Sequence, residues 1–186
     1  TVDELIGLCD DYARQLKEIA SFDEQISILT SETEDTYEEL LRQADKLHKQ
    51  RVAASQKISR QLVDMIIPLG MPHTRFQVEI LPKEEPGSDG MDDIRFLFSA
   101  HKSGELQPVS QTASGGEISR LMLCMKAMIA GFTALPAIIF DEVDMGVSGD
   151  IADKMGEIMY GLSRNMQVIT ITHLPQVAAK GVSHYY

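Results

Sequence analysis

The chain has 186 residues, of which 44% are hydrophobic and 24% are charged, and its net charge is −11. This length is sufficient for one globular core and an extended element, and the negative charge argues against a strong general affinity for DNA. No stretch is apolar enough to cross a membrane, so we expect a cytoplasmic protein without a membrane partner. The two cysteines, Cys9 and Cys124, lack metal-ligand spacing and suit packing positions in a reducing compartment.

The charge is distributed unevenly along the chain. Residues 1–45 contain 13 acidic and 3 basic side chains, whereas residues 46–75 contain 6 basic side chains and 1 acidic one. A basic segment beside an acidic arm is compatible with a nucleic-acid contact. Solvated helix faces give the same pattern, and we favour that explanation.

Residues 2–67 contain no proline and a single glycine, which predicts helix almost throughout. Apolar residues recur at steps of four and three, the spacing of a coiled coil. The phase of the pattern slips near residues 20–25, where we predict a break in a coiled-coil arm that spans residues 1–67. An apolar seam of this length needs a partner helix, so we expect the chain to self-associate.

Residues 68–186 are expected to form a second domain, because a proline-rich turn at 68–72 ends the helix. Alternating residues predict two half-buried strands, at about 75–81 and 94–99, joined by a loop at 82–93. Further elements are expected to alternate as helix 114–131, strand 137–141, helix 149–164, strand 167–172 and a short helix at 175–180. This alternation is typical of an α/β layer with parallel strands. The apolar run at 137–140 predicts a strand buried on both faces.

A polar turn with two glycines, Ser114-Gly115-Gly116-Glu117, opens an apolar-faced run at 118–129. At the start of a helix, such a turn leaves backbone N–H groups unpaired at the positive end of the helix dipole, and the glycines let a phosphate approach. A capping box explains the same residues, because Ser114 and Glu117 have its spacing. Taken alone, the turn leaves an anion site and a plain helix cap as alternatives.

Polar residues follow both expected parallel strands. Asp141 and Glu142 come directly after the run at 137–140, and His173 comes after the run at 167–172. Ligands of parallel sheets bind beyond the carboxyl ends of the strands. There, Asp141 suits hydrated Mg²⁺, Glu142 suits a water to be oriented or deprotonated, and His173 suits a terminal phosphate. A solvated loop start explains the two acids equally well, and the histidine gains weight only beside the other signals.

These residues carry a resemblance to a known family. The string ASGGEISR at Ala113–Arg120 resembles the signature motif of ABC-type ATPases, in the form found in SMC-like DNA repair proteins. The string IIFDEVD at Ile138–Asp144 resembles their Walker B motif, and Val147-Ser148-Gly149 falls, with Asp144, in the position of the D-loop. Thr172–Ala178 resembles the switch-histidine segment. The order of these motifs identifies the chain as a member of the SMC-like ATPases.

The resemblance implies the fold. It is an α/β fold, the C-terminal lobe of an ABC/SMC-type ATPase head with a P-loop NTPase-like parallel sheet, preceded by an antiparallel-type coiled-coil arm. In such proteins the first partner is the N-terminal lobe of the same protein. A second head, bound by homodimerisation, is another partner, and DNA is a partner of the full-length protein.

The resemblance also implies the cofactors and the site. Ser114, Gly115, Gly116 and Glu117 of one head would contact ATP held by the other head. Asp141 would hold Mg²⁺ through water. Glu142 and His173 would be the catalytic residues, and Asp144, Ser148 and Gly149 would form the D-loop. In bacterial members this cycle serves recombinational repair of DNA double-strand breaks at the nucleoid.

No G-x-x-x-x-G-K-[ST] phosphate loop occurs in the chain. In this family the loop lies before the coiled coil, so we expect the chain to be a C-terminal part of a longer protein and to be inactive by itself. Three alternatives stay open. The chain could be a transporter nucleotide-binding domain, the head of another SMC-like chromosome or repair ATPase, or a non-enzymatic coiled-coil module in which the acids and the histidine are incidental.

Overall fold

The computed structural model describes residues 2–111, 115–133, 135–141, 143–144, 146–147 and 149–185. The chain divides into two compact units. The first comprises the chain up to Lys49 together with Lys83–Met91, and the second comprises Gln50–Pro82 and the chain from Asp92 onward. The division therefore falls inside the long helix and differs from the expected boundary at residue 67. The reason is that the last helical turns are part of the core of the second unit, where Leu62 and Ile66 are fully buried.

The first element is α1 (Val2–Ile66), an α-helix of 65 residues. The break expected near residues 20–25 is absent, because α1 continues through this stretch without interruption. A shift in the phase of an apolar seam changes the direction in which the seam faces, but it does not remove a backbone hydrogen bond as a proline would. In the first unit the seam is exposed, as the exposed fractions of Leu16 (67%) and Ile26 (61%) show.

Two long strands form a hairpin, β1 (Arg75–Gly87) and β2 (Gly90–Ser99). The expected loop at 82–93 is therefore wrong, because only Ser88 and Asp89 connect the strands. Gly90 has a φ of 96°, a conformation that glycine adopts without steric cost. In the first unit, Lys83 Nζ lies 2.8 Å from Asp89 Oδ1, which extends the pairing to the tip. A third strand, β3 (Gln107–Pro108), pairs antiparallel with β2.

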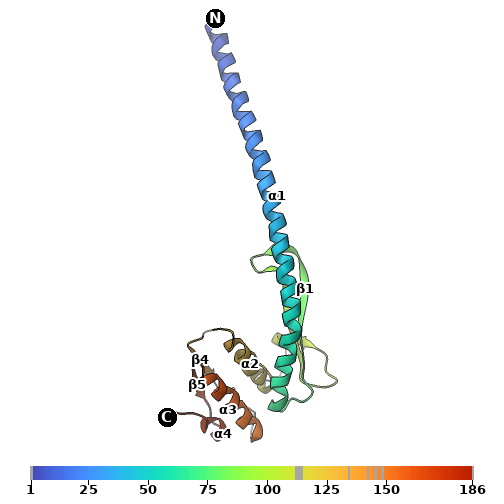
Figure 1. Cartoon of the computed structure of the whole chain (residues 1–186), viewed down its shortest axis with the longest axis vertical. Helices are drawn as coiled ribbons and strands as arrows, with labels where there is room; N and C mark the ends of the chain where they lie inside the picture. Colours follow the sequence, from blue (N-terminus) through green and yellow to red (C-terminus); the bar gives the residue numbers. More distant parts are fainter. Residues whose placement is uncertain are drawn as a thin grey trace. The chain divides into compact units, whose positions relative to one another are not determined.

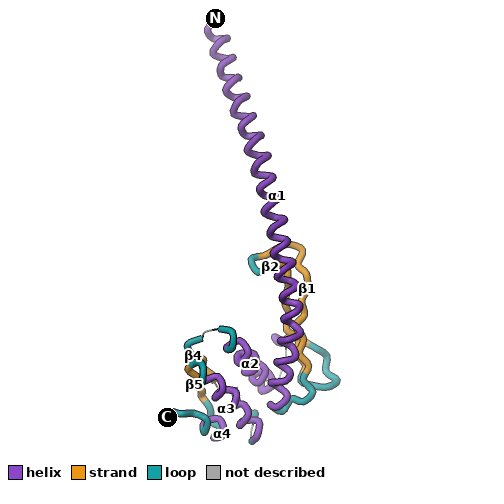
Figure 2. The backbone as a smooth tube through the Cα atoms, viewed as in Figure 1, coloured by secondary structure: helices purple, strands orange, loops and turns teal. Residues whose placement is uncertain are grey.

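The second unit contains both helices and strands (Figure 2). The 3₁₀ helices η1 (Ile67–Leu69) and η2 (Val109–Gln111) flank the hairpin in sequence, and the α-helices are α2 (Gly115–Ala130), α3 (Asp150–Ser163) and α4 (Pro175–Ala178). Helix α3 packs against η1, α2, α4 and the last strand. The largest fully buried side chains are Phe98, Phe140, Leu62, Ile66, Leu69, Leu121, Leu123 and Met155.

A parallel two-stranded sheet completes this unit, β4 (Ala137–Asp141) and β5 (Gln167–Ile171), which lie side by side in Figure 1. Parallel pairing was predicted, and the structure has it. Burial on both faces is wrong for β4, because exposure alternates. Phe140 is fully buried, whereas Ile139 is 59% exposed. In β5, Ile169 and Ile171 share the exposed face. Among the described residues, no layer covers that face.

No helix in the described part of the chain is both long enough and apolar enough to cross a membrane.

Candidate functional site

The carboxyl ends of β4 and β5 meet at one edge of the parallel sheet. Asp141 is the last residue of β4, and its register partner is Ile171, the last residue of β5. Paired Cα atoms on neighbouring strands are about 5 Å apart. His173 comes two residues after Ile171, and the side chains of both Asp141 and His173 are exposed. The structure thus brings these two predicted residues to the same edge, while Glu142 lies outside the described residues.

The segment that follows β4 is anchored in the core. Val143 and Val147 pack against the hydrophobic core, and the N–H of Val147 donates to the carbonyl of Asp144 at 3.3 Å. The turn includes Gly146 with a φ of 73°, which a residue with a Cβ adopts only with strain. This anchoring fixes the backbone immediately beyond the two acids.

Asp144 is buried, with 1% of its surface exposed. Its Oδ2 accepts a hydrogen bond from the hydroxyl of Thr172, which directly precedes His173. Its Oδ1 is also buried and has no hydrogen-bond partner among the described residues. A buried carboxylate is costly unless it is hydrogen-bonded, so this contact is a strong constraint on both segments. The sequence analysis assigned Asp144 to the D-loop by resemblance and did not single out Thr172.

Thr172 is bonded on its other side as well. Its Oγ1 accepts a hydrogen bond from the N–H of Leu174 at 3.0 Å. Leu174 packs against the core, and Val177 in α4 is 5% exposed. The exposed imidazole of His173 therefore extends from a backbone that is held on both sides.

The glycine turn lies at the start of α2. Gly115 is exposed, and a Cβ placed on it would meet no atom within 4 Å. The carbonyl of Gly115 accepts a hydrogen bond from the hydroxyl of Ser119 at 2.9 Å, an interaction one turn into the helix. Ser114 lies outside the described residues, so the capping box stays a prediction. Within the described part, the turn is open to a group that approaches from outside.

Helix α2 is connected to β4 by more than apolar packing. Lys126 Nζ lies 5.7 Å from the centroid of the Phe140 ring, a cation–π distance, and Phe140 directly precedes Asp141. Cys124, on the same helix, is fully buried, and its burial raises the pKa of the thiol to about 12.

Three other predicted residues, Gly149, Glu117 and Ser148, remain to be located. Gly149 has a φ of 59° and lies at the N-cap of α3, and Glu117 is half-buried in the first turn of α2. Ser148 lies outside the described residues.

The side chains at this sheet edge that could bind Mg²⁺ supply only part of a metal site. Within the described ranges, no three His, Cys, Asp or Glu side chains converge as metal ligands. Asp141 is exposed at the sheet edge, so it can supply one oxygen, directly or through water. Mg²⁺ commonly uses one or two carboxylates together with waters and substrate phosphates, which this arrangement permits.

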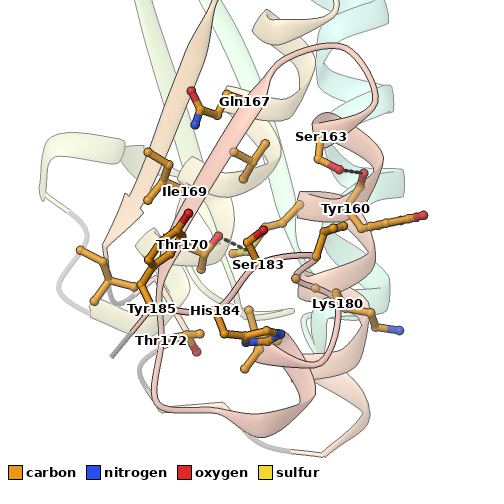
Figure 3. Close-up of a pocket in the computed structure, with 18 residues that line it drawn as sticks. Tyr160, Ser163, Gln167, Ile169, Thr170, Thr172, Lys180, Ser183, His184 and Tyr185 are labelled. Carbon is orange, nitrogen blue, oxygen red and sulfur yellow. Dashed lines mark hydrogen bonds between the residues drawn. The ribbon is translucent and has the colours of Figure 1, made fainter.

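A cavity of about 690 Å³ is lined by all of β5 together with residues of α3, α4 and the segment 180–185. Figure 3 shows Tyr160 and Ser163 of α3, Ile169 and Thr170 of β5, and Lys180 around it. The hydroxyl of Ser163 donates to the carbonyl of Tyr160 at 2.7 Å. Neither Asp141 nor His173 lines this cavity, but Thr172, which directly precedes His173, does.

Solved structures with the same fold are heads of SMC proteins. One is the Smc head domain with an extended coiled coil, bound to the C-terminal domain of ScpA, from Pyrococcus furiosus. It matches with a TM-score of 0.53 and 20% identity, over 67% of this chain and 30% of that one. The Smc head domain with a coiled coil and joint from Pyrococcus yayanosii matches with a TM-score of 0.54 and 19% identity, over 67% and 23%. The fold is therefore that of part of an SMC-type head.

Sequence relatives identify the family more closely. The DNA repair protein RecN of Vibrio cholerae is 36% identical over 169 residues, which are 90% of this chain and 30% of the relative. RecN of Deinococcus radiodurans is 32% identical over 185 residues, or 100% of this chain and 32% of the relative. RecN of Rickettsia felis is 40% identical over 141 residues, or 76% and 26%. No family model matches the chain.

The chain belongs to the RecN family of DNA repair proteins. It spans about a third of the length of these relatives.

Proposed function

We propose that this chain is the C-terminal part of a RecN-type ATPase head, whose ATP-driven dimerisation serves recombinational repair of DNA double-strand breaks. The observation that supports the proposal is the common sheet edge at the ends of β4 and β5, where Asp141 pairs in register with Ile171, two residues before His173. This is the edge at which parallel sheets bind their ligands. The assignment to repair rests on the RecN relatives.

The N-terminal lobe would supply the phosphate loop that this chain lacks. The exposed apolar face of Ile139, Ile169 and Ile171 supports an additional protein layer on the parallel sheet, because three such residues on one face are costly to leave in water.

Three residues of this chain would have separate roles in hydrolysis. Glu142 would orient and deprotonate the attacking water, and His173 would donate a hydrogen bond to the terminal phosphate as negative charge develops there. Asp141 would hold a water of hydrated Mg²⁺. When bound, the metal neutralises phosphate charge and orients the phosphates.

The glycine turn would act on the ATP of a second head. The first N–H groups of α2 point outward from a helix N-terminus, and nothing in the described part covers Gly115. With Ser114 and Gly116, it would bind the terminal phosphate only when two heads close around the nucleotide. Hydrolysis would remove that bridge and open the heads. We place this cycle at the chromosome in the cytoplasm, with DNA as the partner of the full-length protein.

The test joins this chain to the N-terminal lobe and measures ATP hydrolysis with and without DNA. We expect activity from the assembly but not from this chain alone. Glu142→Gln should reduce hydrolysis by roughly 100-fold or more, since it removes the base but not the fold. Glu157→Gln, in the exposed part of α3, is the matched control and should retain activity. Activity that is indifferent to Glu142→Gln would contradict the proposal and favour a non-enzymatic coiled-coil module.

A further inference from the structure

We propose that Asp144 is a positioning residue for His173 and that it acts through Thr172. The inference rests on the proposed ATPase function, because it gives His173 a phosphate to contact. Asp144 itself would touch neither ATP nor the water. Its role would be to hold the segment that follows β5 in register with the segment that follows β4.

Two consecutive hydrogen bonds link Asp144 to Thr172 and Thr172 to Leu174, the two residues on either side of His173. The hydroxyl of Thr172 donates to Asp144 Oδ2, and the same oxygen of Thr172 accepts from the N–H of Leu174 at 3.0 Å. A threonine hydroxyl has one proton to donate, and the bond to Asp144 uses it. Thr172 is therefore oriented by Asp144, and Leu174 is oriented by Thr172. His173 lies between these two residues and has no described hydrogen bond of its own that would fix it.

Asp144, at the other end of this series of hydrogen bonds, is held in place as well. Asp144 is 1% exposed, and Val143 and Val147 on either side of it pack against the core. Asp144 follows Glu142 by two residues in the sequence, and it accepts the bond from Thr172. A displacement of one catalytic segment would thus be transmitted to the other.

Burial of a carboxylate at this position has no packing advantage. An apolar side chain of similar size would avoid the cost of removing a charge from water, and replacement of buried polar groups by apolar ones is often stabilising. The buried Oδ1, which has no described partner, adds to that cost. A positioning role accounts for a carboxylate that stability alone does not require.

The decisive experiment is a double-mutant cycle in the full-length protein. Thr172→Val removes the hydroxyl at nearly constant volume, and we expect kcat to fall by about 10- to 100-fold with little change in KM for ATP, since a misplaced catalytic group acts on the transition state. Thr172→Ser retains the hydroxyl and should restore most of the activity. In a His173→Ala background, Thr172→Val should have little further effect, because the group that it positions is already absent.

Each outcome has a definite meaning. If Thr172→Val lowers kcat equally with and without His173, the hydroxyl does not act through the histidine and the inference is overturned. The same holds if Thr172→Val leaves kcat unchanged while Glu142→Gln abolishes hydrolysis. If the wild type does not hydrolyse ATP or Glu142→Gln has no effect, it is the proposed function that fails. Circular dichroism of each variant, with Ser163→Ala as a control for loss of an exposed hydroxyl, separates misplacement from unfolding.

Discussion

Arg51 Nη1 lies 2.9 Å from Asp92 Oδ2, and this ion pair connects the C-terminal part of α1 to the start of β2 within the second unit. The side chain of Asp92 is 2% exposed and that of Arg51 is 23% exposed. The two residues are 41 positions apart in sequence. The pair therefore contributes a polar, directional contact between the helical arm and the hairpin, in addition to the apolar packing of Leu62 and Ile66.

Arg51→Met is expected to destabilise the chain by about 2–4 kcal/mol, because it removes the cation that lies 2.9 Å from a buried carboxylate. Arg95→Met is the matched control. Arg95 Nη2 lies 2.8 Å from Asp93, but both side chains are about half exposed, so the loss should be below about 1 kcal/mol. Urea denaturation followed by circular dichroism measures both. Equal losses for the two variants would show that burial does not strengthen the Arg51 pair.

The buried thiol of Cys124 should make the stability of the fold depend on pH. Burial raises the pKa of its thiol to about 12, whereas a cysteine in an unfolded chain ionises at about pH 8.5. The unfolded state therefore releases this proton first. The stabilisation is complete below about pH 8.5 and is lost as the pH rises toward 12, by about 2 kcal/mol at pH 10.

The check compares unfolding of the wild type and Cys124→Ala at pH 7 and pH 10. The wild type should lose more stability over this interval than the variant does, since the variant lacks the thiol. Thiol labelling at pH 8 gives an independent test, because exposed Cys9 should react and buried Cys124 should react only after unfolding. Rapid labelling of Cys124 in the folded chain would contradict this account.

The exposed seam of α1 predicts self-association of this chain. Leu16 and Ile26 are 67% and 61% exposed, and further apolar residues at coiled-coil spacing flank them. Light scattering should therefore detect dimers or larger species at high concentration. The double variant Leu16→Glu with Ile26→Glu should shift the chain toward the monomer, because charges at the seam oppose helix pairing.

The control for that experiment places the same charges beside the seam, as Gln15→Glu with Gln25→Glu. This pair adds equal negative charge to the same part of α1 but leaves the apolar residues in place. Association should persist in the control. A wild-type chain that stays monomeric at high concentration would refute the prediction.

The sequence predicted most of what depends on local pattern. The helical arm followed from the absence of proline, and the strand at 137–141 and its parallel partner followed from apolar runs of strand length. The break near 20–25 failed because a phase slip is a property of the seam, not of the backbone. The loop at 82–93 failed because glycine and proline signals were taken to end both strands, whereas only Ser88 and Asp89 form the turn.

The candidate site was predicted as a set of positions but not as a structure. Residues at strand ends can be inferred from sequence, so the positions of Asp141 and His173 at the ends of β4 and β5 were predicted. The bond between Asp144 and Thr172 was not, because it joins residues 28 apart whose approach depends on the register of β4 with β5. The burial of Asp144 could not be predicted for the same reason. Val143 and Val147 pack against the core, but the sequence alone does not show which residues form that core.

The central claim is that the glycine turn of this chain acts on ATP bound by a second head. The most direct test mixes two inactive full-length proteins, one with Ser114→Arg and the other with its phosphate-loop lysine replaced. If the turn acts across the dimer, mixed dimers contain one intact site, and hydrolysis should return to about a quarter of the wild-type rate, since half of randomly formed dimers are mixed. If the turn acts within its own head, no dimer contains an intact site, and a mixture as inactive as its components would contradict the account.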